Sequence, residues 1–233
     1  MRQAVLVTRP EPGLSETVSA VQAQGWRAIA SPLMTMCQRP PMADHPCRAM
    51  LVTSGQALPF LVNQNRDRLL LTVGSRTAQR AEAMGFRHVE AASGTQEGLE
   101  VLCRQKGLSG PGLLLACGRG RHGQPYGAEL AAALGAQRVE AYQVQPAKCL
   151  SGAVLEALAA GQVGAVLFYS SETVSLFMEL CPSELHEQLD QCRAICLSQA
   201  IARRAEEMGP WGCIEVGSPL AALGENHEKR RTI

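Results

Sequence analysis

Short, uninterrupted apolar runs recur along this chain, and Ala- and Leu-rich stretches of helical period follow nearly all of them. The runs are AVLVT (4–8), AMLVT (49–53), LLLTV (69–73), GLLLAC (112–117), AVLFY (165–169) and RAICL (193–197). Strands that are apolar throughout are typical of parallel sheets buried on both faces. Because strands alternate with helices, the sequence predicts an α/β fold with largely parallel, doubly wound sheets.

The predicted helices carry their own end signals. They read SETVSAVQAQG, QALPFLVNQN, TAQRAEAMG, GAELAAALG, ETVSLFMEL and QAIARRAEEMG. Several of them close on a glycine, at Gly25, Gly85, Gly135 and Gly209. Glycine readily adopts the left-handed conformation that ends many helices, so we expect each of these residues to terminate its helix.

The chain also contains an internal repeat. Three pairs of segments match, which are 69–85 with 193–209, 49–64 with 165–180 and, more loosely, 4–32 with 112–146. We name these pairs c, b and a. Each pair reads as a strand, a polar turn and a helix, and the chain runs a-b-c-a-b-c. This order predicts an internal duplication.

Two domain arrangements fit that order. Each half of the chain could form one domain, with a break near residue 110. Alternatively, the Pro-bounded and β-prone stretches PLMTMCQRP (32–40) and EAYQVQP (140–146) are paired crossings between two bodies. We favour the second arrangement. It predicts an outer domain of 1–32 plus 148–233, an inserted domain of 41–141, and linkers at 33–40 and 142–147.

The charge balance excludes several kinds of partner. The 233-residue chain has a formal net charge of +1, which provides no overall field to attract nucleic acid or a membrane surface. No segment approaches the roughly 20 apolar residues of a membrane-spanning helix. The apolar run in MRQAVLVTRPEP is too short for a signal peptide. We expect a cytoplasmic monomer, with ENHEKRR (225–231) as a solvated tail.

Cysteine and histidine usage points to neither disulfides nor metal. The chain has nine cysteines, an odd number, with no C-x-x-C, and its five histidines lie apart from them and from one another. A disulfide framework or a zinc site needs regular spacings that this chain lacks. We expect reduced thiols that are mostly small core residues.

The polar turns after the apolar runs are the candidate sites. They read TRPE (8–11), TSGQ (53–56), GSRT (74–77), CGRGRHG (117–123), YSSET (169–173) and LSQA (197–200). In parallel sheets, ligands bind at the carboxyl ends of strands, where helix N-termini offer unpaired N–H groups to anions. Helix capping alone explains any one Ser or Thr there. The six turns together predict an anion-accepting cleft between two domains.

One of these turns imitates a dinucleotide site. Gly118, Gly120 and Gly123 form G-x-G-x-x-G after a strand, and Glu140 stands about 20 residues on, where a ribose-binding acid belongs. However, QPYG follows at once and delays the helix, and Arg119, Arg121 and His122 crowd a close approach of pyrophosphate. The motif also occurs in only one copy of the repeat. We prefer a basic loop that holds carboxylates or phosphates through its two arginines. An equally open interpretation is a loop that is merely solvated and binds no ligand.

Tyr169 ends a buried run and opens a polar turn. The simplest interpretation is a core tyrosine whose hydroxyl reaches the surface. A tyrosine can otherwise donate a proton at neutral pH, since the phenol of the free residue titrates near ~10. The sequence shows no Ser–His–Asp order, no paired-carboxylate motif and no Walker loop. This inventory favours chemistry without a cofactor and with modest acid–base demands.

Further short motifs stand in a fixed order along nearly the whole chain. They are VLVTRP (5–10), Gly25 followed by Pro32, LVTS (51–54) with Ala57, VGSRTA (73–78) with Gly85, CG (117–118), VEAYQVQP (139–146), FYSS (168–171) with Phe177, and RAEEMG (204–209). In this order and spacing the chain resembles uroporphyrinogen-III synthases. The resemblance implies two flavodoxin-like α/β domains joined by a two-stranded β-ladder, with the active site in the cleft between them.

The resemblance also implies a reaction that needs no metal or cofactor. Hydroxymethylbilane, a linear polycarboxylate, loses its ring A hydroxyl as water. Ring D then attacks through its substituted carbon to give a spiro-pyrrolenine, which rearranges to uroporphyrinogen III with ring D inverted. Hydroxymethylbilane synthase is the expected partner for substrate hand-over.

Most site residues match or neighbour positions of the family, whereas Arg119 and Arg121 are candidates as arginines of the basic loop. Tyr169 matches the family tyrosine thought to assist departure of the hydroxyl, so it is the candidate catalytic residue. The candidate substrate-binding residues are Arg9, Thr53, Ser54, Gly55, Ser75, Thr77, Gly118, Arg119, Arg121, Ser170, Ser171, Ser198 and Gln199.

The second hypothesis is that the chain is a non-catalytic module that kept the cleft. Such a module would bind a tetrapyrrole or another anion, or would have a regulatory role. Gln199 stands where a threonine is usual and Glu172 where a small residue is usual, and both favour this alternative. The short C-terminal segment favours it too. Tyr169 with its following serines, and the two-domain length, favour the enzyme, which is our main hypothesis.

Overall fold

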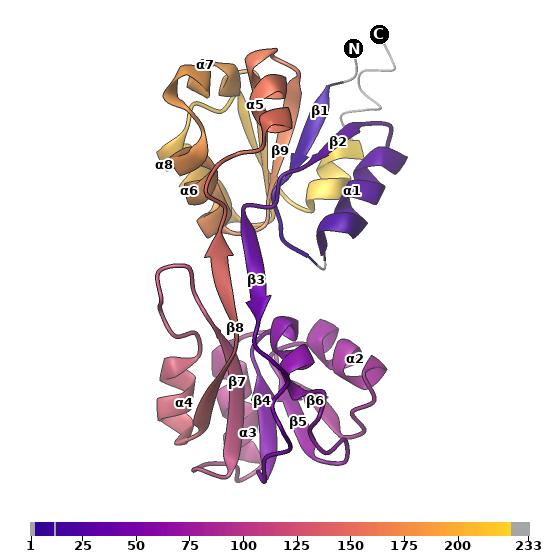
Figure 1. Cartoon of the computed structure of the whole chain (residues 1–233), viewed down its shortest axis with the longest axis vertical. Helices are drawn as coiled ribbons and strands as arrows, with labels where there is room; N and C mark the ends of the chain where they lie inside the picture. The colour runs from indigo at the N-terminus through magenta and orange to yellow at the C-terminus, as the bar shows by residue number, and fades with distance from the viewer. Residues whose placement is uncertain (1–2, 12, 225–233) are drawn as a thin grey trace. The chain divides into compact units, whose positions relative to one another are not determined.

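The structure is a computed structural model that describes residues 3–11 and 13–224 (Figure 1). By its internal contacts the chain divides into two compact units. Unit 1 comprises Met1–Thr35 and Pro146–Ile233, and unit 2 comprises Met36–Gln145. Unit 2 is therefore an insertion in the sequence of unit 1. The tail predicted at 225–231 lies outside the described residues.

Unit 1 is built on a five-stranded sheet in the order β11-β10-β9-β1-β2. Its strands are β1 (Ala4–Val7), β2 (Arg27–Ala30), β9 (Val163–Phe168), β10 (Arg193–Cys196) and β11 (Cys213–Val216). Its helices are α1 (Gly13–Ala23), α5 (Gly152–Ala159), α6 (Ser171–Leu180), η2 (Ser183–Leu185), α7 (His186–Leu189) and α8 (Gln199–Met208). Every pairing in this sheet is parallel.

Helices cover both faces of this sheet, with α1 on one side and α5, α6 and α8 on the other in Figure 1. On the α1 face, Val7 and Leu167 of the strands belong to one buried cluster with Val21 of α1. On the other face, Phe168 packs edge-on against Phe177 of α6, with the ring centroids 5.8 Å apart. All residues of β1 and β9 are buried, which explains why their sequences are apolar throughout.

Unit 2 contains a sheet in the order β3-β8-β7-β4-β5-β6. The strands are β3 (Met34–Gln38), β4 (Ala49–Val52), β5 (Leu69–Thr72), β6 (Val89–Ala91), β7 (Leu113–Arg119) and β8 (Gln137–Pro146). The helices are η1 (Gly55–Leu61), α2 (Ser75–Ala83), α3 (Gln96–Gln105) and α4 (Ala128–Leu134). The pairings from β8 to β6 are parallel. Leu51 and Leu115 of the strands share a core with Leu99 of α3 and Leu130 of α4.

Matching sequence segments take the same places in the two sheets. Segment a supplies β1 and β2 in unit 1 and β7 and β8 in unit 2, while segments b and c supply β9 and β10, and β4 and β5. The two sheets therefore read β2-β1-β9-β10-β11 and β8-β7-β4-β5-β6. The spatial order is the same although the chain order differs, because unit 2 begins with segment b. The predicted parallel α/β fold is confirmed.

Strands β3 and β8 form the ladder through which the chain passes from one unit to the other. They are neighbours in the sheet order. Arg39 N donates to Ala141 O at 2.9 Å, and Ala147 N donates to Leu33 O at 2.8 Å. Pairing of the start of one strand with the end of the other means that the two strands are antiparallel.

The predicted helix QALPFLVNQN is wrong in type. Gly55–Leu61 form a 3-10 helix that contains Pro59. Proline removes a backbone donor, and its ring clashes with the preceding turn of an α-helix. The segment therefore takes the tighter form, which occurs in short pieces.

A glycine stands at the end of the helix at all four predicted positions. Gly25, Gly85 and Gly135 have φ values of 83°, 92° and 66°, as the left-handed end of a helix requires. Gly209 also caps its helix, α8, although its φ of −153° is extended backbone rather than left-handed. Pro210 follows, and the residue before a proline is driven away from helical geometry.

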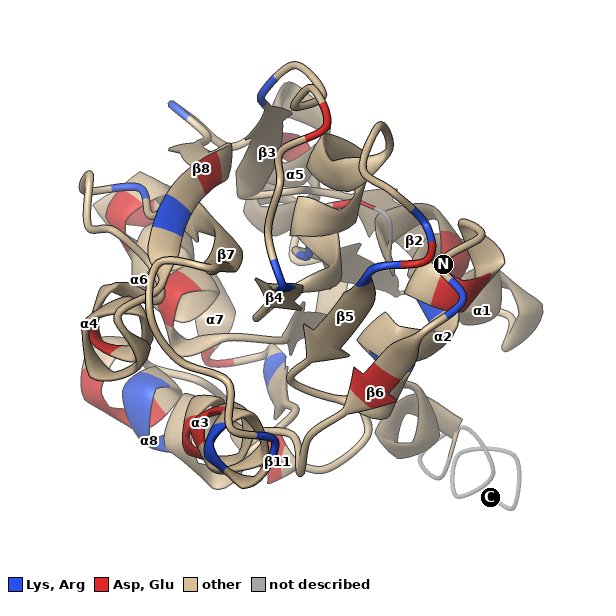
Figure 2. Cartoon of the chain, turned by 90° about the horizontal axis from the view of Figure 1, so that it is seen from below, with Lys and Arg blue, Asp and Glu red and all other residues tan. Residues whose placement is uncertain are grey.

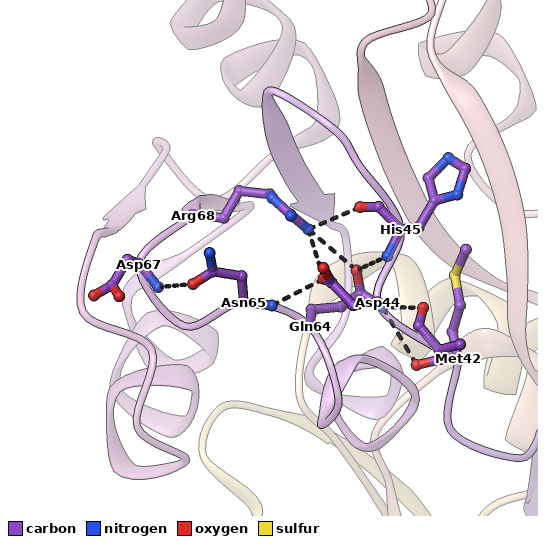
Figure 3. A network of polar contacts seen from close by, with 8 residues as sticks. Met42, Asp44, His45, Gln64, Asn65, Asp67 and Arg68 are labelled. Atoms are coloured by element: carbon purple, nitrogen blue, oxygen red, sulfur yellow. Dashed lines mark hydrogen bonds and ion pairs between the residues drawn. The ribbon is translucent and has the colours of Figure 1, made fainter.

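The irregular segment 41–47, between β3 and β4, is fixed by a polar network within unit 2 (Figure 3). Gln64 is 3% exposed; its Nε2 donates to two backbone carbonyls of the segment at 2.7 and 3.3 Å, and its Oε1 accepts from His45 N at 3.1 Å. Arg68 donates to Asp44 at 3.0 Å and holds the pKa of that carboxyl below its usual value. Side-chain hydrogen bonds thus satisfy backbone groups of this segment that are not paired in a helix or a strand.

All nine cysteines carry free thiols. Burial raises the pKa of Cys181, Cys192 and Cys196 to about 11, whereas Cys149 and Cys213 are exposed. We expect a thiol reagent at about pH 8 to label the two exposed residues first, because the thiolate is the reactive form and burial keeps Cys181, Cys192 and Cys196 protonated. Mass spectrometry after partial labelling checks this. Native-state labelling of Cys181, Cys192 or Cys196 would contradict it, and denaturant must expose all nine thiols.

Candidate functional site

Three neighbouring strands of unit 1 end at one edge of the sheet and bring candidate residues together. Arg9 follows β1, Tyr169 and Ser170 follow β9, and Ser198 follows β10. These strands are adjacent, in the order β10-β9-β1. Because they are parallel, their carboxyl ends share one edge of the sheet. Residues far apart in the sequence therefore line the same edge of unit 1.

Tyr169 and Arg9 are in direct contact at this edge. The guanidinium carbon of Arg9 lies 4.4 Å from the centroid of the Tyr169 ring. Arg9 NH1 also donates to Thr17 Oγ1 of α1 at 3.4 Å. The Tyr169 ring is half-buried against the core beneath α1. A cation over an aromatic face is attracted to it, so the arginine and the ring hold each other in place.

The three serines at this edge differ in their contacts. Ser170 is the N-cap of α6, and its Oγ accepts from Thr173 N at 3.2 Å, as the capping interpretation predicts. Ser171 donates to a backbone carbonyl of α8 at 3.4 Å. Ser198 makes no side-chain cap bond, and both Ser198 and Gln199 are exposed. Ser198 and Gln199 thus offer polar groups to solvent at the start of α8.

In unit 2, the turn after β4 lies beside β7. Thr53 Oγ1 is 3.6 Å from Cys117 Sγ, and Ser54 is the N-cap of η1, with its Oγ accepting from Gln56 N at 3.3 Å. Burial raises the pKa of the Tyr142 phenol, and a side-chain hydrogen bond with Ser54 opposes that shift. Thr53 and Ser54 are therefore already engaged in local contacts.

Gly118 has a structural reason to be glycine. It is buried in β7 and stands opposite Tyr142 of β8 in the strand register. A Cβ on Gly118 would overlap the ring of that tyrosine. Glycine within an apolar strand often marks such a close approach. Its role in substrate binding remains a prediction.

The remaining candidates of unit 2 gather around the start of α2. Ser75 and Thr77 lie in its first turn, after the N-cap residue Gly74. A Cβ on Gly55 would overlap the guanidinium of Arg80, which therefore lies against the turn after β4. Arg80 is a cation at this edge that the sequence analysis missed. Its place in RAEAMG, on the helix that follows a candidate turn, was the available signal.

Arg119 is the last residue of β7, and Arg121 lies in the loop that follows and folds back on this strand. Arg119 is ion-paired with Glu140 at 2.6 Å and donates to Gly123 O at 3.0 Å. Arg39 pairs with the same carboxylate from the other side, at 2.5 Å. Arg121 is half-buried in the turn. Arg119 is thus already satisfied by a protein carboxylate.

These contacts also decide against a dinucleotide site. The strand continues through Arg119, Gly120 N donates to Gln124 O at 2.8 Å, and α4 begins only at Ala128. No helix therefore begins inside the G-x-G-x-x-G motif. Glu140 faces two guanidinium groups rather than standing ready for a ribose.

Glu140 gives unit 2 a testable pH dependence. Hydrogen bonds from Arg39, followed by those from Arg119, hold the pKa of the Glu140 carboxyl below its usual value. A carboxylate whose pKa is lowered by folding contributes stability above the unfolded pKa and loses it as the pH falls through the folded value. We expect Glu140→Gln to flatten the decline of unit 2 stability between about pH 5 and pH 3. Urea unfolding followed by circular dichroism at each pH measures this, and an unchanged slope would contradict it.

Segments with positive and negative side chains are interspersed over the ribbon in Figure 2, in keeping with the net charge of +1. Among the described residues, no group of three or more His, Cys, Asp or Glu could hold a metal ion. None of the helices in that part of the chain combines the length and hydropathy needed to cross a bilayer. At a net charge of +1, anion binding would rest on local arginines, hydroxyls and helix starts.

Comparison with known proteins places the chain in a family. Residues 15–210 match the family model of uroporphyrinogen-III synthase HemD. The chain belongs to the uroporphyrinogen-III synthase family. The match includes segments of both units, from α1 to the end of α8. The resemblance expected from the short motifs is thereby confirmed.

Solved structures of uroporphyrinogen-III synthases share the fold. The chain is 17% identical to uroporphyrinogen-III synthetase from Helicobacter pylori 26695, with 98% of this chain and 99% of that chain covered and a TM-score of 0.63. A mutant uroporphyrinogen III synthase from the extremely thermophilic bacterium Thermus thermophilus is 16% identical, with 97% and 98% covered and a TM-score of 0.53. A comparison with curated proteins gives no match.

Proposed function

We propose that this protein is an active uroporphyrinogen-III synthase, a cyclising lyase that converts hydroxymethylbilane into uroporphyrinogen III. The family match over residues 15–210 is the observation that supports this proposal most. We further propose that it works in the cytoplasm as a monomer and receives its substrate from hydroxymethylbilane synthase. Nine free thiols are in keeping with a reducing compartment.

In the proposed mechanism, Tyr169 donates its phenolic proton to the departing ring A hydroxyl. The C–O bond breaks, water leaves, and the electron pair of the ring A pyrrole nitrogen stabilises the resulting azafulvene. Ring D then attacks through its substituted carbon, and the spiro intermediate fragments and recombines. The proton lost when the last pyrrole regains aromaticity balances the one that the phenol gave. Holding the chain curled is the larger task, since it selects spiro closure over simple closure.

We propose that carboxylates of the substrate are held by the turns at the carboxyl edges of the two sheets. The exposed Ser198 and Gln199, and the first turn of α2 with Ser75 and Thr77, offer hydroxyls, an amide and helix-start N–H groups. Arg119 would have to exchange Glu140 for a substrate carboxylate, so we rank it below these groups. A polycarboxylate can in this way be bound by a chain of almost zero net charge.

One assay tests the proposed function. Hydroxymethylbilane made freshly by its synthase is supplied to the protein, the products are oxidised, and the porphyrin isomers are separated. We expect isomer III in excess over the enzyme-free control, in which the chain closes to isomer I. A product mixture identical to the control would overturn the catalytic function and leave the non-catalytic alternative, which Gln199 and Glu172 favour.

A further inference from the structure

The contact between Arg9 and Tyr169 has a third participant in Gly13, the first residue of α1. Gly13 is buried, and a Cβ there would overlap the guanidinium of Arg9. Arg9 thus lies between two fixed surfaces, the Tyr169 ring at 4.4 Å and the start of α1, where Thr17 Oγ1 accepts from NH1 at 3.4 Å. Glycine at this position makes room for the arginine.

No carboxylate among the described residues pairs with Arg9. Its contacts there are the ring of Tyr169 and the hydroxyl of Thr17, which is 2% exposed and itself donates to Gly13 O at 2.7 Å. The guanidinium charge is therefore directed at the aromatic face rather than neutralised by an ion pair. A cation over the face of an aromatic ring is stabilised further when negative charge develops on that ring.

We propose that Arg9 is a positioning residue that acts through Tyr169, and that Gly13 is required for this contact. This inference rests on the proposed function. When the phenol gives its proton to the leaving hydroxyl, negative charge develops on Tyr169, and the guanidinium stabilises it. Arg9 also fixes the ring orientation, so that the hydroxyl of Tyr169 stays at the carboxyl edge of β9.

The first test compares kinetic constants for Arg9→Met, Arg9→Lys and Gly13→Ala. We expect Arg9→Met and Gly13→Ala each to lower kcat by about tenfold with little change in KM, and Arg9→Lys to restore part of the loss. Gly13→Ala retains both contact residues and displaces only the end of a flexible side chain, so the helix should stay folded. Gly152→Ala is the matched control, because Gly152 is the first residue of α5 and a Cβ there has nothing within 4 Å.

A double-mutant cycle separates this role from direct substrate binding. If Arg9 acts through the phenol, Arg9→Met changes the residual rate of Tyr169→Phe by no more than about twofold. If Arg9 instead binds a substrate carboxylate, the two losses multiply and Arg9→Met raises KM in both backgrounds, which overturns the inference. An active wild type with an unchanged kcat in Arg9→Met overturns it as well. A wild type that forms only isomer I overturns the proposed function itself, and with it the role of Arg9.

A measurement without substrate tests the contact alone. In protein labelled with carbon-13 at its tyrosine rings, the Tyr169 signal is assigned as the one that Tyr169→Phe removes. We expect Arg9→Met and Gly13→Ala to shift this signal in the same direction, and Gly152→Ala to leave it in place. A Tyr169 signal that stays in place in both Arg9→Met and Gly13→Ala would show that Arg9 does not contact the ring, whether or not the protein is active.

Discussion

Replacing Tyr169 by phenylalanine is expected to lower the rate of isomer III formation by about a hundredfold or more, because a positioned proton donor contributes roughly that much to bond cleavage. Tyr169 directly follows β9, and its half-buried side chain packs against the core beneath α1. Phenylalanine keeps that packing and the contact with Arg9. The loss should therefore appear in turnover rather than in folding.

The measurement is the initial rate and the isomer ratio with fresh hydroxymethylbilane, together with a thermal unfolding curve for each variant. Tyr126→Phe is the matched control, since it removes a phenol hydroxyl from unit 2 and should retain the wild-type rate. An unchanged rate in Tyr169→Phe would remove the assigned role. A lowered unfolding midpoint would mean that the hydroxyl stabilises unit 1 instead.

Replacing Phe168 by alanine is expected to destabilise unit 1 by about 3–5 kcal/mol, the usual cost of removing a buried phenylalanine from a core. Its side chain has no exposure and packs against Phe177 and Trp211, with ring centroids 5.8 and 5.5 Å away. Phe168 O also accepts from Leu197 N at 3.1 Å, which ties β9 to the turn after β10. A cavity here would loosen the scaffold directly before Tyr169.

Tryptophan fluorescence reports this change selectively, because Trp26 and Trp211 both lie in unit 1. We expect the fluorescence midpoint in urea to fall by more than about 1 M, given the usual slope of about 1–3 kcal/mol per M. Leu197→Ala is the control, since Leu197 is 48% exposed and its truncation should change the midpoint little. A Phe168→Ala midpoint close to that of the control would show that the cavity is refilled by neighbouring side chains.

The central strands of both sheets could be predicted from the sequence, because burial on both faces of a sheet produces a local pattern that can be recognised along the chain. β1, β4 and β9 are buried at every position, so their residues are apolar without interruption. The strands β6 and β11 were missed, since most of their residues are half-buried or exposed and they stand at sheet edges. Because few residues of an edge strand are buried, its sequence contains no apolar run that would mark it as a strand.

The candidate site could be predicted only as a set of separate turns. Each turn is visible locally, as a polar stretch between a strand and a helix, and Ser54 and Ser170 do cap the helices that follow them. The contact between Arg9 and Tyr169 joins residues that lie far apart in the sequence and depends on β1 pairing with β9. Strand order is a property of the whole fold, so no local pattern could reveal that contact.

The split of unit 1 into two pieces has a consequence for biosynthesis. A ribosome delivers β1 and β2 first and then all of unit 2, and only afterwards β9, the other neighbour of β1. Unit 2 is continuous and can fold as soon as it has emerged. The apolar β1 meanwhile has one edge unpaired, so this nascent segment can pair with another chain until β9 has been made.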